Sequence, residues 1–201
     1  MLRLRAPLVL ASASPRRREL LSRLGLRFEV APSDADETWP SGRPPGPAVE
    51  ELAARKAEAV AVAHPGALVL GADTVVVLDG EVLGKPPTPE AARRALRRLS
   101  GREHTVYTGI ALVHGGRTVT AHEATAVRFG PLAEGEIAAY VATGSPMDKA
   151  GAYGIQDDAG SLFVEGVTGD YFNVVGLPLH RLYRTLKAEY ADLVEVDASG
   201  G

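Results

Sequence analysis

Three consecutive arginines stand where the sequence predicts the start of a helix. In the segment LVLASASPRRRELLSRLG, residues 8–25, an apolar strand-like run is followed by Ser12, Ser14 and then Arg16–Arg18. The first turn of a helix already carries partial positive charge, so arginines there cost stability unless an anion is bound. Hydroxyls, free N–H groups and guanidinium forks are all donors to phosphate oxygens. The segment therefore predicts a phosphate site, without the P-loop pattern GxxxxGK[ST]; the alternative is an exposed basic turn.

An aspartate separates two apolar runs in the segment ALVLGADTVVVL. An ionised carboxylate at Asp73 needs a metal, a cation or hydrogen bonds, because burying an uncompensated charge is costly. The end of a central strand is a common place for an acid that holds Mg²⁺ or a water molecule. Asp36 and Glu37, in an acidic loop, are candidates to complete a metal site. The alternatives are a turn at Asp73 that binds its own backbone, and solvated acids in the loop.

Two lysines stand at unusual places. Lys56 lies four residues from both Leu52 and Val60, so it shares the apolar face of a predicted helix. Its ammonium either extends out to solvent or points into a cleft. Lys85, in the segment GKPP, follows a predicted hairpin strand, and the prolines stiffen its backbone. The alternative for Lys85 is an ordinary exposed loop lysine.

Polar side chains gather in a glycine-rich stretch, DKAGAYGIQDDAG. They are Asp148, Lys149, Gln156, Asp157 and Asp158. Glycines let a backbone approach a ligand closely, and the Gln156 amide offers both a donor and an acceptor, which suits a base edge. The stretch is either a ligand-binding loop or an ordinary polar loop.

The elements that position these residues alternate between helix and strand. We expect a strand over 7–12, a helix capped by Ser14 with Pro15 at its first position and ended by Gly25, and a helix from about Pro47 to His64 with Glu50 and Glu51 in its first turn. We then expect two strands interrupted at Gly71–Asp73, hairpin turns at Asp79–Gly80 and Gly115–Gly116, a helix from Thr88 to Leu99, a short helix within 132–144, a further strand, and a helix begun by Pro178. This order predicts an α/β protein with a frayed tail over 191–201.

Composition bounds the class of protein. The chain has 201 residues, 45% of them hydrophobic, which is enough for one domain or two modest lobes with a substantial core. A formal net charge of −3 gives no general attraction to nucleic acid or to anionic membranes. The absence of cysteine excludes disulfides and thiolate metal sites and fits a reducing compartment. With no membrane-spanning run and no signal-peptide pattern, we expect a soluble cytoplasmic protein.

Seven segments together resemble a known family. ASASPRRRELLSRLG, ARKAEAV, GADTVV, GEVLGKP, LSGREHTVYTG, DKAGAYGIQ and VVGLPL match, in order and spacing, the Maf proteins, the septum-formation family of nucleoside triphosphate pyrophosphatases. The likeness covers roughly residues 7–188, and DKAGAYGIQ resembles the branch that acts on dTTP and UTP.

The resemblance implies a fold and an activity. The expected fold is a two-lobed Maf/ITPase-like α/β domain over residues 1–190, with an elongated twisted mixed sheet flanked by helices and a central cleft. The expected enzyme is a homodimeric hydrolase in nucleotide metabolism. It would convert dTTP and UTP, or modified pyrimidine nucleotides, to the monophosphate and pyrophosphate with Mg²⁺ or Mn²⁺. The resemblance also links such house-cleaning of the nucleotide pool to septum formation and arrest of cell division.

The resemblance also implies roles for individual residues. Asp73 matches the proton acceptor of the family. The positions that match phosphate- and metal-handling residues are Ser12, Arg16, Arg17, Glu37, Lys56 and Lys85. Those that match positions associated with base choice are Arg16, Thr74 and Gln156. We therefore expect Asp73, Lys56 and Lys85 to be catalytic, Glu37 and Asp73 to hold the metal, and the remainder, with Ser14, to bind substrate.

Two other classes of function remain as alternatives. One is a non-catalytic nucleotide-binding regulator of cell division, which steady release of pyrophosphate would exclude. The other is a nucleic-acid-binding protein that uses the arginine run. That protein would bind a duplex with an affinity that falls steeply with salt, and the acidic net charge argues against it.

Overall fold

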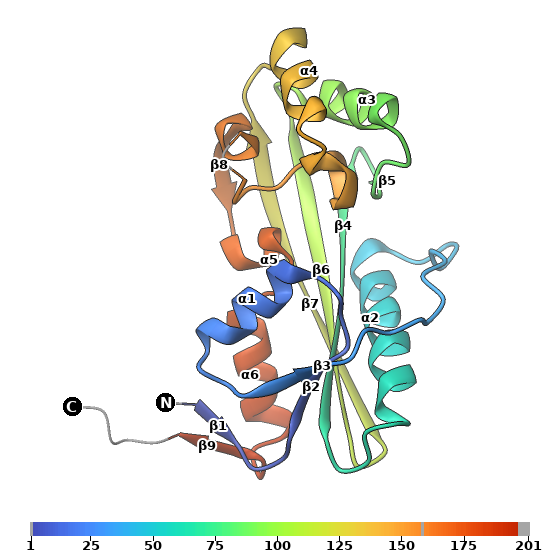
Figure 1. Ribbon diagram of the computed structural model, residues 1–201, viewed down its shortest axis with the longest axis vertical. Coiled ribbons are helices and arrows are strands. Elements are labelled where there is room, and N and C mark those ends of the chain that lie inside the picture. The colour runs from blue at the N-terminus through green and yellow to red at the C-terminus, as the bar shows by residue number, and fades with distance from the viewer. Residues whose placement is uncertain (1, 158, 197–201) are drawn as a thin grey trace, which may run out of the picture. The chain divides into compact units, whose positions relative to one another are not determined.

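The computed structural model describes residues 2–157 and 159–196 (Figure 1). The chain divides into two compact units. Unit 1 comprises Met1–Asp73, Thr108–Glu123 and Gly176–Gly201, and unit 2 comprises Thr74–Tyr107 and Ala124–Val175. Three of the four unit boundaries fall inside strands, because strands β4, β6 and β7 each contribute residues to both units, and the fourth follows residue Val175.

A mixed sheet provides the framework. The described part of the chain forms a seven-stranded sheet in the order β3-β2-β4-β6-β7-β8, with β5 paired to β4. The strands are β2 (Leu8–Leu10), β3 (Phe28–Val30), β4 (Leu68–Leu78), β5 (Glu81–Leu83), β6 (Glu103–His114), β7 (Arg117–Phe129) and β8 (Val164–Thr168). Strand β2 is parallel to both β3 and β4, whereas β5 and β8 are antiparallel to their partners. Strands β1 (Leu2–Leu4) and β9 (Val194–Val196) form a separate antiparallel pair.

Two of the helices begin after capping residues that the sequence marks clearly. The helices are α1 (Pro15–Arg23), α2 (Pro45–Ala61), α3 (Pro89–Leu99), α4 (Glu134–Ala142), α5 (Tyr171–Val175) and α6 (Leu179–Glu189). The side chains of Ser14 and Thr88 cap α1 and α3 by accepting backbone N–H groups in the first turn. Short 3₁₀ turns, at Ser145–Asp148, Ala150–Ala152 and Gly160–Phe163, connect α4 to β8.

In unit 1, helix α2 packs very closely on the sheet. Small residues of α2, Ala53 and Ala57, share a buried cluster with apolar residues of β2, β4 and β6. A Cβ atom added at Gly71 would lie 2.2 Å from the Ala53 carbonyl oxygen, and one at Gly109 would lie 2.3 Å from the Val49 backbone. Figure 1 shows α2 and α6 on opposite sides of these strands. This close packing fixes where along strand β4 the side chains of α2 make contact.

Unit 2 has an aromatic core. The fully buried Phe129 makes edge-to-face contacts with His104, Tyr153 and Phe163 at ring-centroid distances of 5.0, 4.7 and 6.0 Å. The hydroxyl of Tyr153 lies 2.8 Å from Nε2 of His104. Burial lowers the pKa of His104 from 6.5 to about 4, so the imidazole is neutral in the folded protein near pH 7.

Most predicted turns and caps are confirmed. The hairpin turns fall at Asp79–Gly80 and Gly115–Gly116, all four residues having positive φ, and Gly25 follows the end of α1 in the same conformation. The final helix begins after Pro178 as expected.

The predicted interruption at Gly71–Asp73 is wrong, because β4 runs unbroken from Leu68 to Leu78. Gly71 is required by the close approach of α2, not by a turn.

Helix α2 begins at Pro45, so Glu50 and Glu51 lie beyond its first turn. Part of the predicted frayed tail is strand β9, and residues 197–201 lie outside the described part of the chain. Strands β1 and β3 and helix α5 are additional elements that the sequence patterns did not indicate.

Candidate active site

Arg17, in the first turn of helix α1, makes hydrogen bonds to groups outside the helix. Nη1 of Arg17 donates to Oγ of Ser12 at 3.2 Å, and Nε donates to the carbonyl oxygen of Gly176 at 2.9 Å. Ser12 Oγ also accepts the backbone N–H of Ser14 at 3.2 Å. Three of the predicted phosphate-binding residues, Ser12, Ser14 and Arg17, thus lie together, and half-buried Arg16 precedes Arg17 in the same turn.

A lysine bridges the two predicted metal-binding acids. Nζ of Lys56, from α2, lies 2.6 Å from Oδ1 of Asp73 on β4 and 2.9 Å from Oε1 of Glu37 in the preceding loop. The side chain of Lys56 is only 9% exposed, and that of Asp73 is 14% exposed. Lys56 therefore does not extend to solvent from its apolar helix face, because the carboxylates compensate its buried charge.

These two groups of residues share one electrostatic environment. Burial lowers the pKa of the Arg17 guanidinium, and the carboxylates of Asp73 and Glu37 oppose that shift. Arg16 adds to the lowering because it is a neighbouring like charge. Unit 1 therefore collects cations from α1 and α2 around two carboxylates, which is a suitable arrangement for a substrate that brings its own negative charge.

The acid pair has the chemistry of a divalent-cation site. Two carboxylates converge on the single ammonium of Lys56, and Mg²⁺ is commonly bound by one or two carboxylates together with water and substrate phosphates. In the described residues, no group of three or more His, Asp or Glu side chains is placed to hold a metal by protein ligands alone. Asp36 is engaged elsewhere, because its Oδ1 accepts from the backbone N–H and hydroxyl of Thr38 at 2.9 and 2.6 Å.

The remaining predicted residues belong to unit 2. Thr74 follows Asp73 along β4 and is half buried. Lys85 is exposed in the loop between β5 and α3, and the preceding carbonyl, at Gly84, accepts the N–H of Gly151 at 3.2 Å. Gln156 is exposed in the glycine-rich loop. The structure thus assigns the predicted phosphate- and metal-handling residues to unit 1, apart from Lys85, and Thr74 and Gln156 to unit 2.

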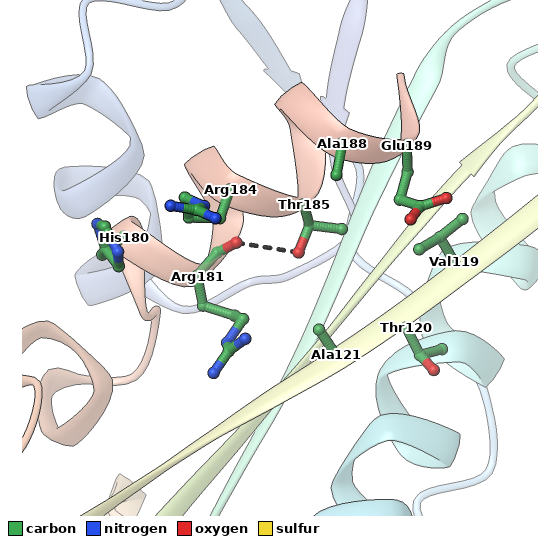
Figure 2. Close-up of a pocket in the computed structure, with 9 residues that line it drawn as sticks. All are labelled: Val119, Thr120, Ala121, His180, Arg181, Arg184, Thr185, Ala188 and Glu189. Atoms are coloured by element: carbon green, nitrogen blue, oxygen red, sulfur yellow. Dashed lines mark hydrogen bonds between the residues drawn. The ribbon is translucent and has the colours of Figure 1, made fainter. Parts of the chain in front are cut away.

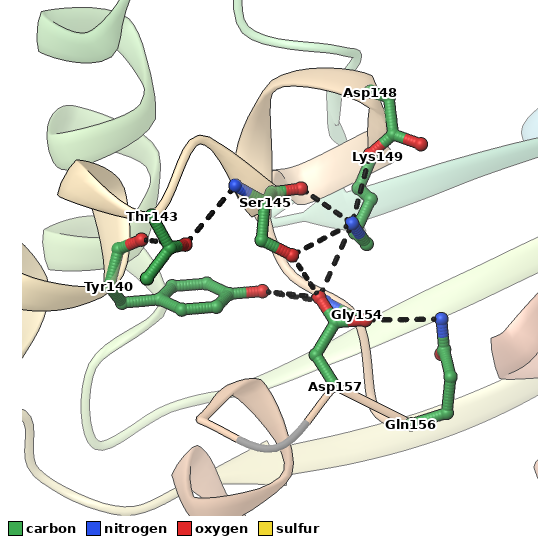
Figure 3. A network of polar contacts seen from close by, with 8 residues as sticks. All are labelled: Tyr140, Thr143, Ser145, Asp148, Lys149, Gly154, Gln156 and Asp157. Carbon is green, nitrogen blue, oxygen red and sulfur yellow. Dashed lines mark hydrogen bonds and ion pairs between the residues drawn. The ribbon is translucent and has the colours of Figure 1, made fainter.

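The glycine-rich loop is held by a polar network that includes residues outside the predicted site (Figure 3). Asp157 accepts hydrogen bonds from the hydroxyls of Tyr140 and Ser145, and Lys149 lies 3.3 Å from the same carboxylate. Tyr140 lies in a predicted helix and Ser145 just beyond it, and neither carries a motif signal. The only signal in the sequence was the combination of Lys149 and Asp157 with many glycines. Asp158 lies outside the described residues.

A separate hollow in unit 1 contains none of the predicted site residues. It has a volume of about 430 Å³ and lies between α6 and β7 (Figure 2). Arg181 on its wall pairs with Glu123, and the hydroxyl of Thr185 donates to the Arg181 carbonyl. The Arg181 guanidinium and the Thr185 hydroxyl thus have partners within the protein.

Comparison with known proteins identifies the family of this chain. The family model described as "Maf-like protein" matches residues 7–189. The chain belongs to the Maf family. It is 58% identical to the dTTP/UTP pyrophosphatase of Salinibacter ruber, over 99% of this chain and 98% of that protein. It is 57% identical to the dTTP/UTP pyrophosphatase of Symbiobacterium thermophilum, over 89% of this chain and 92% of that protein.

A third relative, the dTTP/UTP pyrophosphatase of Moorella thermoacetica, is 61% identical over 86% of this chain and 89% of its own length. The relatives therefore match this Maf chain over both units. Among the residues that the structure describes, no helix is long and apolar enough to cross a membrane.

Proposed function

We propose that this Maf chain hydrolyses dTTP and UTP to the nucleoside monophosphate and pyrophosphate. The observation that carries the proposal is the cluster in unit 1, where Lys56 joins Asp73 and Glu37 and where Arg17 lies over the start of α1. The relatives named dTTP/UTP pyrophosphatases support the same reaction and the same substrates.

The arginine-rich helix start binds the phosphates. The triphosphate carries several negative charges, and cleavage at the α-phosphorus transfers further charge to the leaving pyrophosphate. Arg16, Arg17 and the hydroxyls of Ser12 and Ser14 supply fixed donors at this place. A bound anion also relieves the cost of placing cations at the positive end of a helix.

Asp73 accepts the proton of the attacking water. The water oxygen forms a bond to the α-phosphorus, the bond from that phosphorus to the bridging oxygen breaks, and pyrophosphate leaves with the bonding electrons. The ammonium of Lys56 lies 2.6 Å from Oδ1 of Asp73 and so pairs with the carboxylate that acts as the base. Lys56 and Lys85 neutralise the phosphate oxygens that these steps leave charged.

Glu37 and Asp73 are the residues that would hold Mg²⁺ or Mn²⁺. A divalent cation bound there would polarise the phosphoryl oxygens and make bound water more acidic.

The base is selected by Thr74, Gln156 and Arg16. The Gln156 amide matches the O4 and N3–H edge that thymine and uracil share. We therefore expect poor hydrolysis of CTP, ATP and GTP.

The test is pyrophosphate release from these five nucleotides with Mg²⁺ or Mn²⁺. Asp73→Asn should retain the fold and reduce kcat at least ~10²-fold, the effect of losing a general base. Asp79→Asn is a matched control, because Asp79 lies at 64% side-chain exposure in a hairpin turn and should leave turnover unchanged. Chelation of the divalent cation should abolish turnover.

Near-normal turnover by folded Asp73→Asn would contradict the mechanism. Nucleotide binding without any pyrophosphate release would favour a non-catalytic regulator instead. A homodimer and a link to septum formation stay predictions from the family, and a cytoplasmic location stays a prediction from the sequence. Sedimentation equilibrium tests the first of these.

A further inference from the structure

The carboxylate of Asp157 is held rigidly by donors on one side. Its Oδ2 accepts the hydroxyl of Tyr140 at 2.9 Å and that of Ser145 at 2.7 Å, and Nζ of Lys149 lies 3.3 Å away. The Tyr140 hydroxyl accepts the backbone N–H of Gly154 at 3.2 Å, so its own proton is directed toward Asp157. Burial raises the pKa of Tyr140 above its usual value, so the phenol remains a donor throughout the physiological range.

The other oxygen of this carboxylate faces Gln156. Nε2 of Gln156 donates to Oδ1 of Asp157 at 3.3 Å (Figure 3). An ionised carboxylate is an acceptor only, so the amide must present its NH₂ group to it. The flipped amide would bring Oε1 against Oδ1, which places two acceptors face to face. Asp157 therefore decides which end of the Gln156 amide faces the carboxylate and which group remains for a ligand.

The orientation of this amide distinguishes two classes of pyrimidine. Uracil and thymine present an acceptor at O4 beside a donor at N3–H, whereas cytosine presents a donor at N4 beside an acceptor at N3. An amide in one orientation complements the first pair, and the same amide flipped complements the second. An amide that is free to flip would accept both bases.

We propose that Asp157 is a positioning residue that fixes the Gln156 amide and thereby selects uracil and thymine nucleotides over cytosine nucleotides. The inference rests on the proposed function, in which Gln156 contacts the base. Buried Lys149 contributes to this positioning. Its ammonium lies beside Oδ2 of Asp157 and helps to hold that oxygen, so that Oδ1 faces Gln156. The selecting element is the fixed hydrogen-bond polarity of the loop, and Asp157 itself touches no substrate.

The test is Asp157→Asn, scored by the ratio of kcat/KM for UTP to that for CTP. The donors from Tyr140, Ser145 and Lys149 will hold the Asn oxygen in the Oδ2 position. The Asn NH₂ group then faces Gln156, whose amide must flip to accept it. We expect the ratio to fall at least about 10-fold, because CTP gains while UTP loses. A merely structural role would slow both substrates alike and leave the ratio unchanged.

The control is Asp148→Asn, the same acid-to-amide change at a second partner of Lys149. Asp148 lies 2.9 Å from Nζ at 61% side-chain exposure, so this variant should retain the wild-type ratio. In a Gln156→Ala background, Asp157→Asn should have no further effect on the ratio, since the amide through which it acts is gone.

Each outcome separates the two proposals. Wild-type protein that releases no pyrophosphate from UTP or dTTP refutes the proposed function. A wild type that does so, with a ratio that Asp157→Asn changes less than about twofold, refutes the role of Asp157 alone. If Asp157→Asn fails to fold, Ser145→Ala carries the test. It removes one donor to Oδ2 and should lower the ratio by a smaller factor, and an unchanged ratio would overturn the inference.

Discussion

Arg17 shows how one residue can serve both the free protein and a bound anion. Three arginines at a helix start suggest a site that is strained until phosphate arrives. In the structure, Arg17 makes hydrogen bonds to Ser12 and to the Gly176 carbonyl, so part of that cost is already offset. Arg18, one residue later, is exposed. A comparison of substitutions at Arg17 and Arg18 therefore distinguishes the loss of local hydrogen bonds from the loss of a positive charge.

Replacing these two arginines should have opposite effects on stability. Arg17→Ala loses two hydrogen bonds, so we expect a free energy of unfolding lower by about 1 kcal/mol, together with a raised KM for dTTP and UTP. Arg18→Ala removes a like charge from the positive end of α1, and should leave stability equal or slightly higher with KM unchanged. Thermal unfolding without ligand and steady-state kinetics measure both. An equal effect of the two substitutions on KM would show that the site recognises net charge only.

At the scale of elements, glycines set how α2 meets the sheet. Lys56 reaches Asp73 because α2 lies almost in backbone contact with β4, and Gly71 permits that approach. The sequence suggested a break in the strand at this glycine, because glycine punctuates strands as readily as it admits a neighbouring helix. The distinction depends on an element far away in the sequence.

Gly71→Ala should displace α2 from β4. The new Cβ would lie 2.2 Å from the Ala53 carbonyl oxygen and 2.9 Å from the Ala57 nitrogen, both of which are backbone atoms that cannot rotate away. We expect a loss of about 1 to 3 kcal/mol in stability and a lower kcat, because Lys56 and Asp73 lie on the two displaced elements. Gly135→Ala is the control. It lies in α4 with no atom within 4 Å of the new Cβ, so it should stabilise by up to ~1 kcal/mol without changing kcat. Equal melting temperatures for the two variants would contradict this account of the packing.

For the whole molecule, the buried aromatic core of unit 2 makes stability depend on pH. His104 has a folded pKa of about 4, against 6.5 for an ordinary histidine. As pH falls below 6.5, the unfolded chain takes up a proton that the folded chain does not, so stability falls with decreasing pH.

Between pH 7 and pH 5 this single group should lower the free energy of unfolding by about 2 kcal/mol. His104→Gln, which retains a polar partner for Tyr153 but does not titrate, should show a shallower decline over the same range. Urea unfolding of both proteins at the two pH values measures the difference. Parallel declines would assign the acid sensitivity to other groups.

The sequence by itself determined the elements whose signals are local. Each of these signals depends on a few adjacent residues and is found in the structure: the Ser14 cap, the helix opened at Thr88, the Asp-Gly and Gly-Gly turns, and the final helix after Pro178. The motifs also predicted the family, because their order and spacing can be read along the chain without knowledge of how the chain packs. The site residues follow from that resemblance, and their roles remain to be tested by the substitutions above.

Only the tertiary structure decided which groups meet. Lys56, Asp73 and Glu37 come from a helix, a strand and a loop, so their shared contact depends on how closely α2 packs. The continuity of β4 through Gly71 was decided in the same way. So was the network around Asp157, where Tyr140 and Ser145 donate to one carboxylate oxygen and leave the other for Gln156. Hydrogen-bond polarity of this kind arises from long-range contacts, and no spacing of residues along the chain encodes it.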